Sequence, residues 1–209
     1  MLGFGSRWYQ KLLGRPFVYN RVRPWIVGGV DMTDFYESLE ADASEVIVDV
    51  GCGTGDALRY LSSFKSYHGF DIDPGAIEFA RTQSAGRPGV TFEARAMTAE
   101  DLASLRPSLV ILAGLLHHMD DEQSVGLLEL LGRTPSIQRI ATQDVVYLPR
   151  EPMSNFLARL DRGKFVRKED GYRSLVARAG LRLESRQVVR SHPESGRARY
   201  LIMTLAPPT

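Results

Sequence analysis

Three glycines at alternate positions, Gly51, Gly53 and Gly55, follow an apolar run that ends in Asp49 and Val50. A run of β-branched residues that leads into such a turn is typical of a buried parallel strand. Glycine allows the turn to adopt positive φ and lets a ligand approach its N–H groups closely. An ordinary strand-to-helix turn seldom needs three glycines, so the spacing predicts that a cofactor lies against this turn.

Two carboxylates indicate which kind of cofactor the turn serves. Dinucleotide-binding turns carry a glycine at the sixth position, where this chain has Asp56. A carboxylate there repels a diphosphate, which favours a nucleoside without phosphates. Asp71, about twenty residues after the first glycine, stands where an acid accepts both hydroxyls of a ribose. The alternative for Asp71 is a helix cap, but Asp73 already suits that role.

The elements that position these residues alternate between strands and helices. Strands are expected over residues 45–50, 67–70, 90–94, 108–113 and 137–146, and helices over 31–40, 56–64, 73–81, 99–105, 121–131, 152–160 and 168–179. Residues 181–189 and 197–205 are expected to form an antiparallel hairpin. This order favours an α/β fold with a doubly wound, Rossmann-like sheet of seven strands, mostly parallel.

Ligands bind beyond the carboxyl ends of the strands in such sheets. That rule brings the glycine turn, Asp71, Ala96, Met97 and residues 114–118 to one crevice.

Composition limits the partners. The chain has 209 residues, and 26 lysines and arginines against 25 acidic residues give a net charge of +1, without the basic excess of a nucleic-acid binder. The single cysteine, Cys52, excludes an internal disulfide and a cysteine-rich metal site. We find no apolar run as long as a membrane helix and no signal-peptide pattern. We therefore expect a cytoplasmic protein without a membrane or nucleic-acid partner.

The first 40 residues differ from the rest. Aromatic side chains alternate there with basic ones, which predicts a helical cap or lid over residues 1–40, followed by one domain over residues 41–209. A membrane-surface helix and a simple packing arm remain alternatives. Tyr19 is the candidate from this segment for a wall of the substrate pocket.

Several stretches resemble the class I S-adenosylmethionine-dependent methyltransferases. They are Val-Asp-Val-Gly-Cys-Gly-Thr-Gly at 48–55, Gly-Phe-Asp-Ile-Asp-Pro at 69–74 and Gly-Leu-Leu-His-His-Met-Asp-Asp at 114–121. The Leu-His-His element, with Asp161-Arg162-Gly163 and Val166-Arg167, is similar to a bacterial small-molecule branch of that class. The resemblance covers roughly residues 17–190. It implies S-adenosylmethionine as cofactor and a small-molecule methyl acceptor, anionic or a natural-product intermediate.

The resemblance also implies the cofactor site. Gly51 and Gly53 would approach the methionine part, Asp49 would organise the turn, Asp71 would hold the ribose and Ile72 would flank the adenine. Ala96 and Met97 stand where family members commonly carry an acid for the adenine amino group. The predicted set is Asp49, Gly51, Cys52, Gly53, Gly55, Asp71, Ile72, Ala96, Met97 and Gly114.

Methyl transfer from a sulfonium mainly requires alignment of the acceptor and needs no metal, so we expect none. His117 and His118 are candidate bases for an acceptor that must lose a proton, since histidine titrates near neutral pH. The alternative is that they only shape the pocket. Arg162 and Arg167, in a basic cluster, are candidates to hold an anionic substrate, with a solvated helix face as the alternative.

Two other functions remain open. The first keeps S-adenosylmethionine but uses it in an intramolecular attack that releases methylthioadenosine. The second is a binding module without catalysis that retains the fold.

Overall fold

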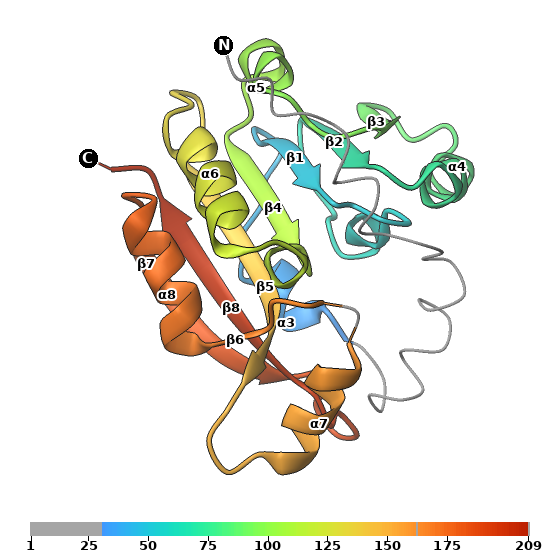
Figure 1. The fold of residues 1–209 in the computed structure, drawn as a ribbon. Coiled ribbons are helices and arrows are strands. Elements are labelled where there is room, and N and C mark those ends of the chain that lie inside the picture. The colour runs from blue at the N-terminus through green and yellow to red at the C-terminus, as the bar shows by residue number, and fades with distance from the viewer. Residues whose placement is uncertain (1–30, 162, 209) are drawn as a thin grey trace.

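The computed structural model describes residues 31–161 and 163–208. The described residues therefore do not include Tyr19, Arg162 or residues 1–30 of the predicted N-terminal segment. The strands are β1 (Val46–Val50), β2 (Ser66–Asp71), β3 (Val90–Ala94), β4 (Leu109–Ala113), β5 (Arg139–Tyr147), β6 (Arg167–Lys168), β7 (Arg182–Arg190) and β8 (Arg199–Ala206). They form one sheet in the order β3-β2-β1-β4-β5-β8-β7, with β6 beside β5 (Figure 1).

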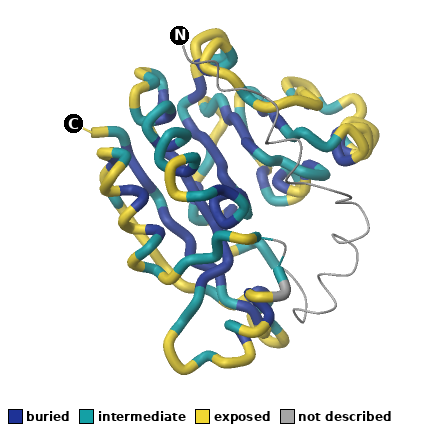
Figure 2. The backbone as a smooth tube through the Cα atoms, viewed as in Figure 1, coloured by how far each residue is buried: buried dark blue, intermediate teal, exposed yellow. Residues whose placement is uncertain are grey.

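Helices cover both faces of the sheet. They are α3 (Thr33–Glu37), η1 (Asp56–Arg59), α4 (Pro74–Gln83), α5 (Ala99–Leu105), η2 (Leu116–His118), α6 (Asp121–Gly132), α7 (Pro152–Leu160) and α8 (Glu169–Arg178), where η marks a 3₁₀ helix. Alternate residues of a strand point to opposite faces, so Val48 packs with α5, α6 and α8 while Ile47 packs with α3 and α4. Figure 2 shows the inner strands as the buried centre of the molecule, whereas the edge strands β3 and β7 are largely exposed.

The predicted fold is confirmed, including the antiparallel C-terminal pair β7–β8. The sheet has eight strands where seven were expected. The extra strand, β6, has two residues that pair with Val146 and Tyr147 at the end of β5. Two residues are too few to produce a periodic pattern, which is why the sequence did not reveal this strand.

The helix predicted over residues 56–64 is wrong in extent, because η1 ends at Arg59. Arg87 explains the early end. Its guanidinium donates hydrogen bonds to the carbonyls of Leu58 and Leu61, each at 2.7 Å. These carbonyls are therefore satisfied by a side chain from beyond α4, without a continued helix. By contrast, α4 starts as expected, with Asp73 as cap and Pro74 in the first position.

The described end of the predicted N-terminal segment packs on the domain. Phe35 and Tyr36 of α3 are buried against strands β1 and β2. The Asp31 N–H donates to the carbonyl of Ser191, near the end of β7 (2.6 Å). Within the described residues, no helix combines the length and the apolar character needed to cross a membrane.

Candidate active site

The glycine turn follows β1 and keeps positive φ at all three positions: +78° at Gly51, +52° at Gly53 and +74° at Gly55. A Cβ on Gly51 would lie 3.1 Å from the side chain of Leu115, so this glycine lets the loop after β4 approach the turn. A Cβ on Gly53 would meet nothing within 4 Å. The turn is therefore open beside Gly53 and offers room for a ligand there.

Asp71 connects the end of β2 to this turn. Its Oδ2 accepts a hydrogen bond from the Gly53 N–H and its Oδ1 accepts one from the Asp73 N–H, both at 2.9 Å. Partial burial raises the pKa of the carboxyl. Each carboxylate oxygen can accept a second hydrogen bond, so Asp71 can hold the turn and still accept from a ligand hydroxyl.

Asp49 lies beneath the turn and is 2% exposed. Its Oδ2 accepts a short hydrogen bond from the Tyr67 hydroxyl (2.6 Å), while Oδ1 has no hydrogen-bond partner among the described residues. Burial raises the pKa of Asp49 to about 7, although the Tyr67 hydrogen bond opposes this shift. At neutral pH the turn therefore rests on a buried acid close to its own titration point.

This burial makes stability depend on pH. The folded-state pKa of Asp49 lies above the unfolded value of about 3.9. Protonated Asp49 therefore makes its full contribution to the free energy of unfolding below pH 4, and this contribution is lost as pH rises through about 7. The uncharged Asp49→Asn variant should be more stable than the wild type at pH 8, by at most about 4 kcal/mol, and similar at pH 4. Urea unfolding of the ligand-free protein at both pH values tests this. The exposed Asp56→Asn is the control, and a parallel shift at both pH values would contradict the assignment.

The remaining predicted cofactor residues lie at the ends of neighbouring strands. Cys52 is half-buried, and burial raises the pKa of its thiol, so it is not a nucleophilic thiolate. Ile72 directly follows β2 and is half-buried, Ala96 beyond β3 is exposed, and Met97 packs at the edge of the core. Gly114 has a φ of +72°, and its N–H donates to the carbonyl of Gln143 on β5. These placements leave their cofactor roles as predictions.

His117 is fully buried between two carboxylates that sequence reasoning did not connect with it. Its Nδ1 lies 2.7 Å from Oδ1 of Asp144, and the same oxygen accepts from the His117 backbone N–H (3.1 Å). Its Nε2 lies 3.3 Å from Oδ1 of Asp161 without an aligned hydrogen-bond partner among the described residues. Burial lowers the pKa of the imidazole, but attraction to Asp144 and Asp161 outweighs burial and raises it.

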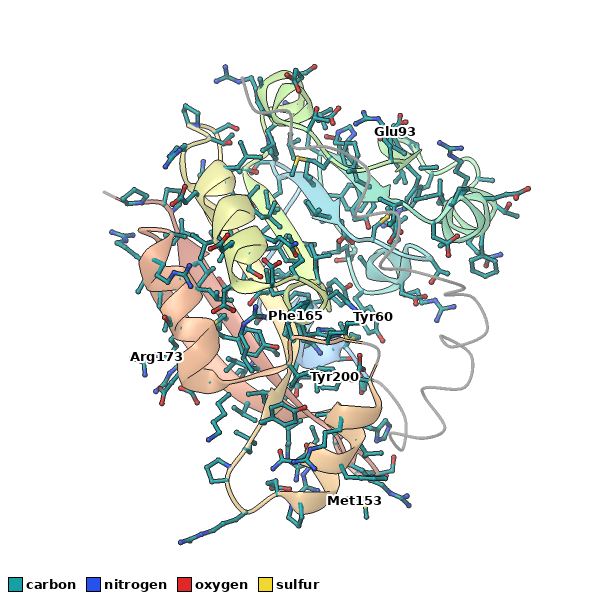
Figure 3. The ribbon with its side chains drawn as sticks, viewed as in Figure 1. Tyr60, Glu93, Met153, Phe165, Arg173 and Tyr200 are labelled. Carbon is teal, nitrogen blue, oxygen red and sulfur yellow. The ribbon has the colours of Figure 1, made fainter. Side chains whose placement is uncertain are left out.

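The segment after α7 closes over His117. The Phe165 N–H donates to the His117 carbonyl (3.0 Å), and Phe165 is labelled in Figure 3. A Cβ on Gly163 would overlap the His117 ring and lie 2.7 Å from its carbonyl oxygen. Only glycine therefore fits where this segment crosses the histidine. The His118 ring, half-buried, lies beside that of His117 with 4.2 Å between centroids.

Asp144 is the site residue that the sequence analysis missed. It is 1% exposed and lies near the end of β5, in a strand whose other residues are largely apolar or uncharged. An aspartate inside such a strand is the available signal, because a buried charge requires a partner. The partner is His117, in η2 just beyond the adjacent strand β4.

Arg167, predicted to hold an anionic substrate, makes its hydrogen bonds within the fold. Its Nε and one terminal nitrogen donate to Asp121 Oδ1, and the terminal nitrogens also donate to the carbonyls of Leu116, Phe165 and Met119, at 2.7–2.9 Å. A guanidinium has five N–H donors, and these five bonds use all of them. Arg167 therefore fixes the loop after β4 and has no donor left for a substrate.

Arg167→Lys should accordingly destabilise the fold by about 1.5–3 kcal/mol, because an ammonium cannot reproduce the planar set of donors. Thermal unfolding with calorimetry measures the loss. Arg173→Lys is the matched control, since Arg173 is on the same side of the sheet, is half-exposed and pairs only with the exposed Asp170 among the described residues. Equal stability of the two variants would contradict the conclusion that Arg167 fixes the loop after β4.

A cavity of about 200 Å³ lies beside the glycine turn, between η1 and α4. Its lining includes Thr54, Gly55, Phe79 and Arg87, but not Gly53, Asp71 or Gly114. This cavity therefore does not coincide with the cofactor crevice that the sequence predicts at the ends of β1, β2 and β4.

Comparison with known proteins agrees with this geometry. Residues 47–134 match a family model described as a methyltransferase domain. Two curated relatives are phosphoethanolamine N-methyltransferases of Triticum aestivum, 25% identical over 121 residues (56% of this chain) and 23% identical over 178 residues (83%). The chain spans only 23% and 34% of their respective lengths.

Solved structures share the fold at low identity. A Leishmania major S-adenosylmethionine-dependent methyltransferase superposes with a TM-score of 0.66, 18% identity and coverage of 95% of this chain and 82% of its own. The magnesium protoporphyrin IX methyltransferase of Synechocystis, with bound S-adenosylhomocysteine, superposes with a TM-score of 0.61 and 16% identity. The superposition covers 95% of this chain and 92% of that structure. Residues 47–134 are thus similar to a methyltransferase domain, and the described chain shares the fold of these solved methyltransferase structures.

Proposed function

We propose that this protein is an S-adenosylmethionine-dependent methyltransferase that acts on a small-molecule acceptor. The observation that carries the proposal is the open glycine turn, which is hydrogen-bonded to Asp71 through Gly53. The methyltransferase-domain match over the same residues supports it.

The residues of the turn fit the proposed cofactor. Gly51 and Gly53 would lie against its methionine part, and Asp71 would accept from the ribose hydroxyls with its remaining lone pairs. Asp49, whose buried Oδ1 accepts no hydrogen bond from the described residues, would organise the turn. When bound, the cofactor supplies an activated methyl group, and the task of the chain is to align an acceptor behind it.

A small acceptor is supported by the names of the relatives, which act on phosphoethanolamine and on magnesium protoporphyrin IX. Its class stays open here, because the internal use of Arg167 removes one of the two arginines predicted to hold an anion. Arg162 remains the other candidate. Of the two predicted bases, His118 is half-buried, whereas His117 is fully buried between carboxylates.

The test is incubation of the purified chain with S-adenosylmethionine carrying a labelled methyl group and an extract of small metabolites. The expected products are S-adenosylhomocysteine and one labelled small molecule, identified by mass spectrometry. Release of methylthioadenosine would instead support the intramolecular reaction. No binding of S-adenosylmethionine in calorimetry would support a module without catalysis.

A further inference from the structure

Three side chains with metal-binding atoms meet beyond the end of β4. His117 and His118 come from η2, and Asp161 directly follows α7. Each offers one ligand atom, and the three atoms lie within 4.8 Å of one another. Two histidines and one carboxylate are a donor set that suits zinc and other divalent transition metals.

His117 has the environment of a metal ligand. Its side chain is fully buried, its Nδ1 is held by Asp144, and its Nε2 points toward Asp161 without an aligned hydrogen-bond partner among the described residues. Metal-ligating histidines usually donate their other ring N–H to a carboxylate, which orients the ring and increases its basicity. Asp144 stands in that position.

The charges in this group favour a bound cation. The side chains of Asp144 and Asp161 are 2% and 6% exposed, and both carboxylates lie within 3.3 Å of a ring nitrogen of His117. Asp144 Oδ2 is also buried and accepts no hydrogen bond from the described residues. A divalent ion next to Nε2 would place positive charge beside these two buried carboxylates, in a region where the attraction is little screened by water.

We propose that His117 Nε2, His118 and Asp161 bind a divalent transition-metal ion, with Asp144 as the residue that orients His117. Bond lengths of about 2.0–2.2 Å in a tetrahedral site place ligand atoms about 3.4 Å apart. His117 Nε2 and Asp161 Oδ1 are already 3.3 Å apart, so binding requires His118 to approach them by at most about 1.5 Å. This assignment replaces the role of general base for both histidines and reverses the expectation that the protein needs no metal. Three protein ligands leave a fourth position for an oxygen of water or acceptor.

Zinc ion alone is the probe. The full chain, stripped with a chelator, is dialysed against Zn²⁺, and bound zinc is measured by elemental analysis and titration calorimetry. We expect about one equivalent for the wild type, binding at least tenfold weaker for His118→Ala and Asp161→Asn, and about 10–100-fold weaker for Asp144→Asn. His68→Gln is the control, because the His68 ring contacts the hydroxyls of Ser66 and Thr91. Circular dichroism confirms that each variant is folded.

Two results would overturn the proposal: a wild type that binds no zinc, or ligand variants that bind zinc as tightly as the wild type, which places the ion elsewhere. Binding of S-adenosylmethionine is measured on the same samples. Cofactor binding without zinc binding rejects the metal site and leaves the proposed methyltransferase function intact. Zinc binding without cofactor binding rejects the proposed methyltransferase function and leaves the metal site intact.

Discussion

Asp71→Ala is expected to weaken S-adenosylmethionine binding by about 1.5–3 kcal/mol, or roughly 10–150-fold, the range for losing hydrogen bonds to a charged group. The variant loses the proposed ribose acceptor. It also removes the acceptor of the Gly53 N–H, so the turn keeps only the hydrogen bonds that the Gly51 and Cys52 N–H groups donate to the Phe70 carbonyl of β2. Titration calorimetry on the folded variant measures the change.

The matched control for Asp71 is Asp56→Ala. Asp56 lies in the same loop, but its side chain is 58% exposed and contacts only Thr54 and Arg59 among the described residues. Its loss should change cofactor affinity by less than about 1 kcal/mol. If Asp71→Ala binds S-adenosylmethionine as tightly as this control, Asp71 does not hold the ribose.

Replacing His117 by leucine is expected to lower the free energy of unfolding by about 3–5 kcal/mol, because it leaves Asp144 and Asp161 buried next to an uncharged side chain. Urea unfolding at pH 7 in the presence of a chelator measures the loss without a contribution from bound metal. We expect this loss of stability to come mainly from the contact between the loop after β4 and the segment around Gly163.

His68→Leu provides the comparison for His117→Leu. His68 is a half-buried histidine on β2 whose ring is hydrogen-bonded to hydroxyl groups and not to a carboxylate. We expect a loss below about 1.5 kcal/mol for this change. Similar losses in the two variants would mean that the buried carboxylates do not depend on His117.

The parts of the site that the sequence predicted are those built from neighbouring residues. The glycine turn and Asp49 occupy one short stretch, and Asp71 ends the next strand, where the position of a strand end is visible in the hydrophobic pattern. The register of adjacent strands is not visible in that way. The pairing of Ala113 with Gln143 brings Asp144 next to the end of β4, and this register alone unites Asp144 with His117.

The two other differences from expectation have the same cause. Arg167 and Arg87 both satisfy backbone carbonyls that are distant in sequence, and a sequence shows that an arginine is charged but not which carbonyls it will meet. Arg167 thereby fixes the loop after β4. Arg87 satisfies carbonyls that would otherwise need a helix continued beyond Arg59.

The position of β8 between β5 and β7 has a consequence for biosynthesis. A ribosome makes β5 well before β8, so during that interval the backbone edge of β5 has no partner on one side. Ile140 and Val145, which are buried in the finished fold and paired with Leu205 and Tyr200 of β8, then lack these neighbours. Unpaired apolar strand edges promote association between chains. The chain is therefore most prone to associate with other chains before residues 199–206 emerge from the ribosome. During this interval, the strand that carries Asp144 is paired on one side only.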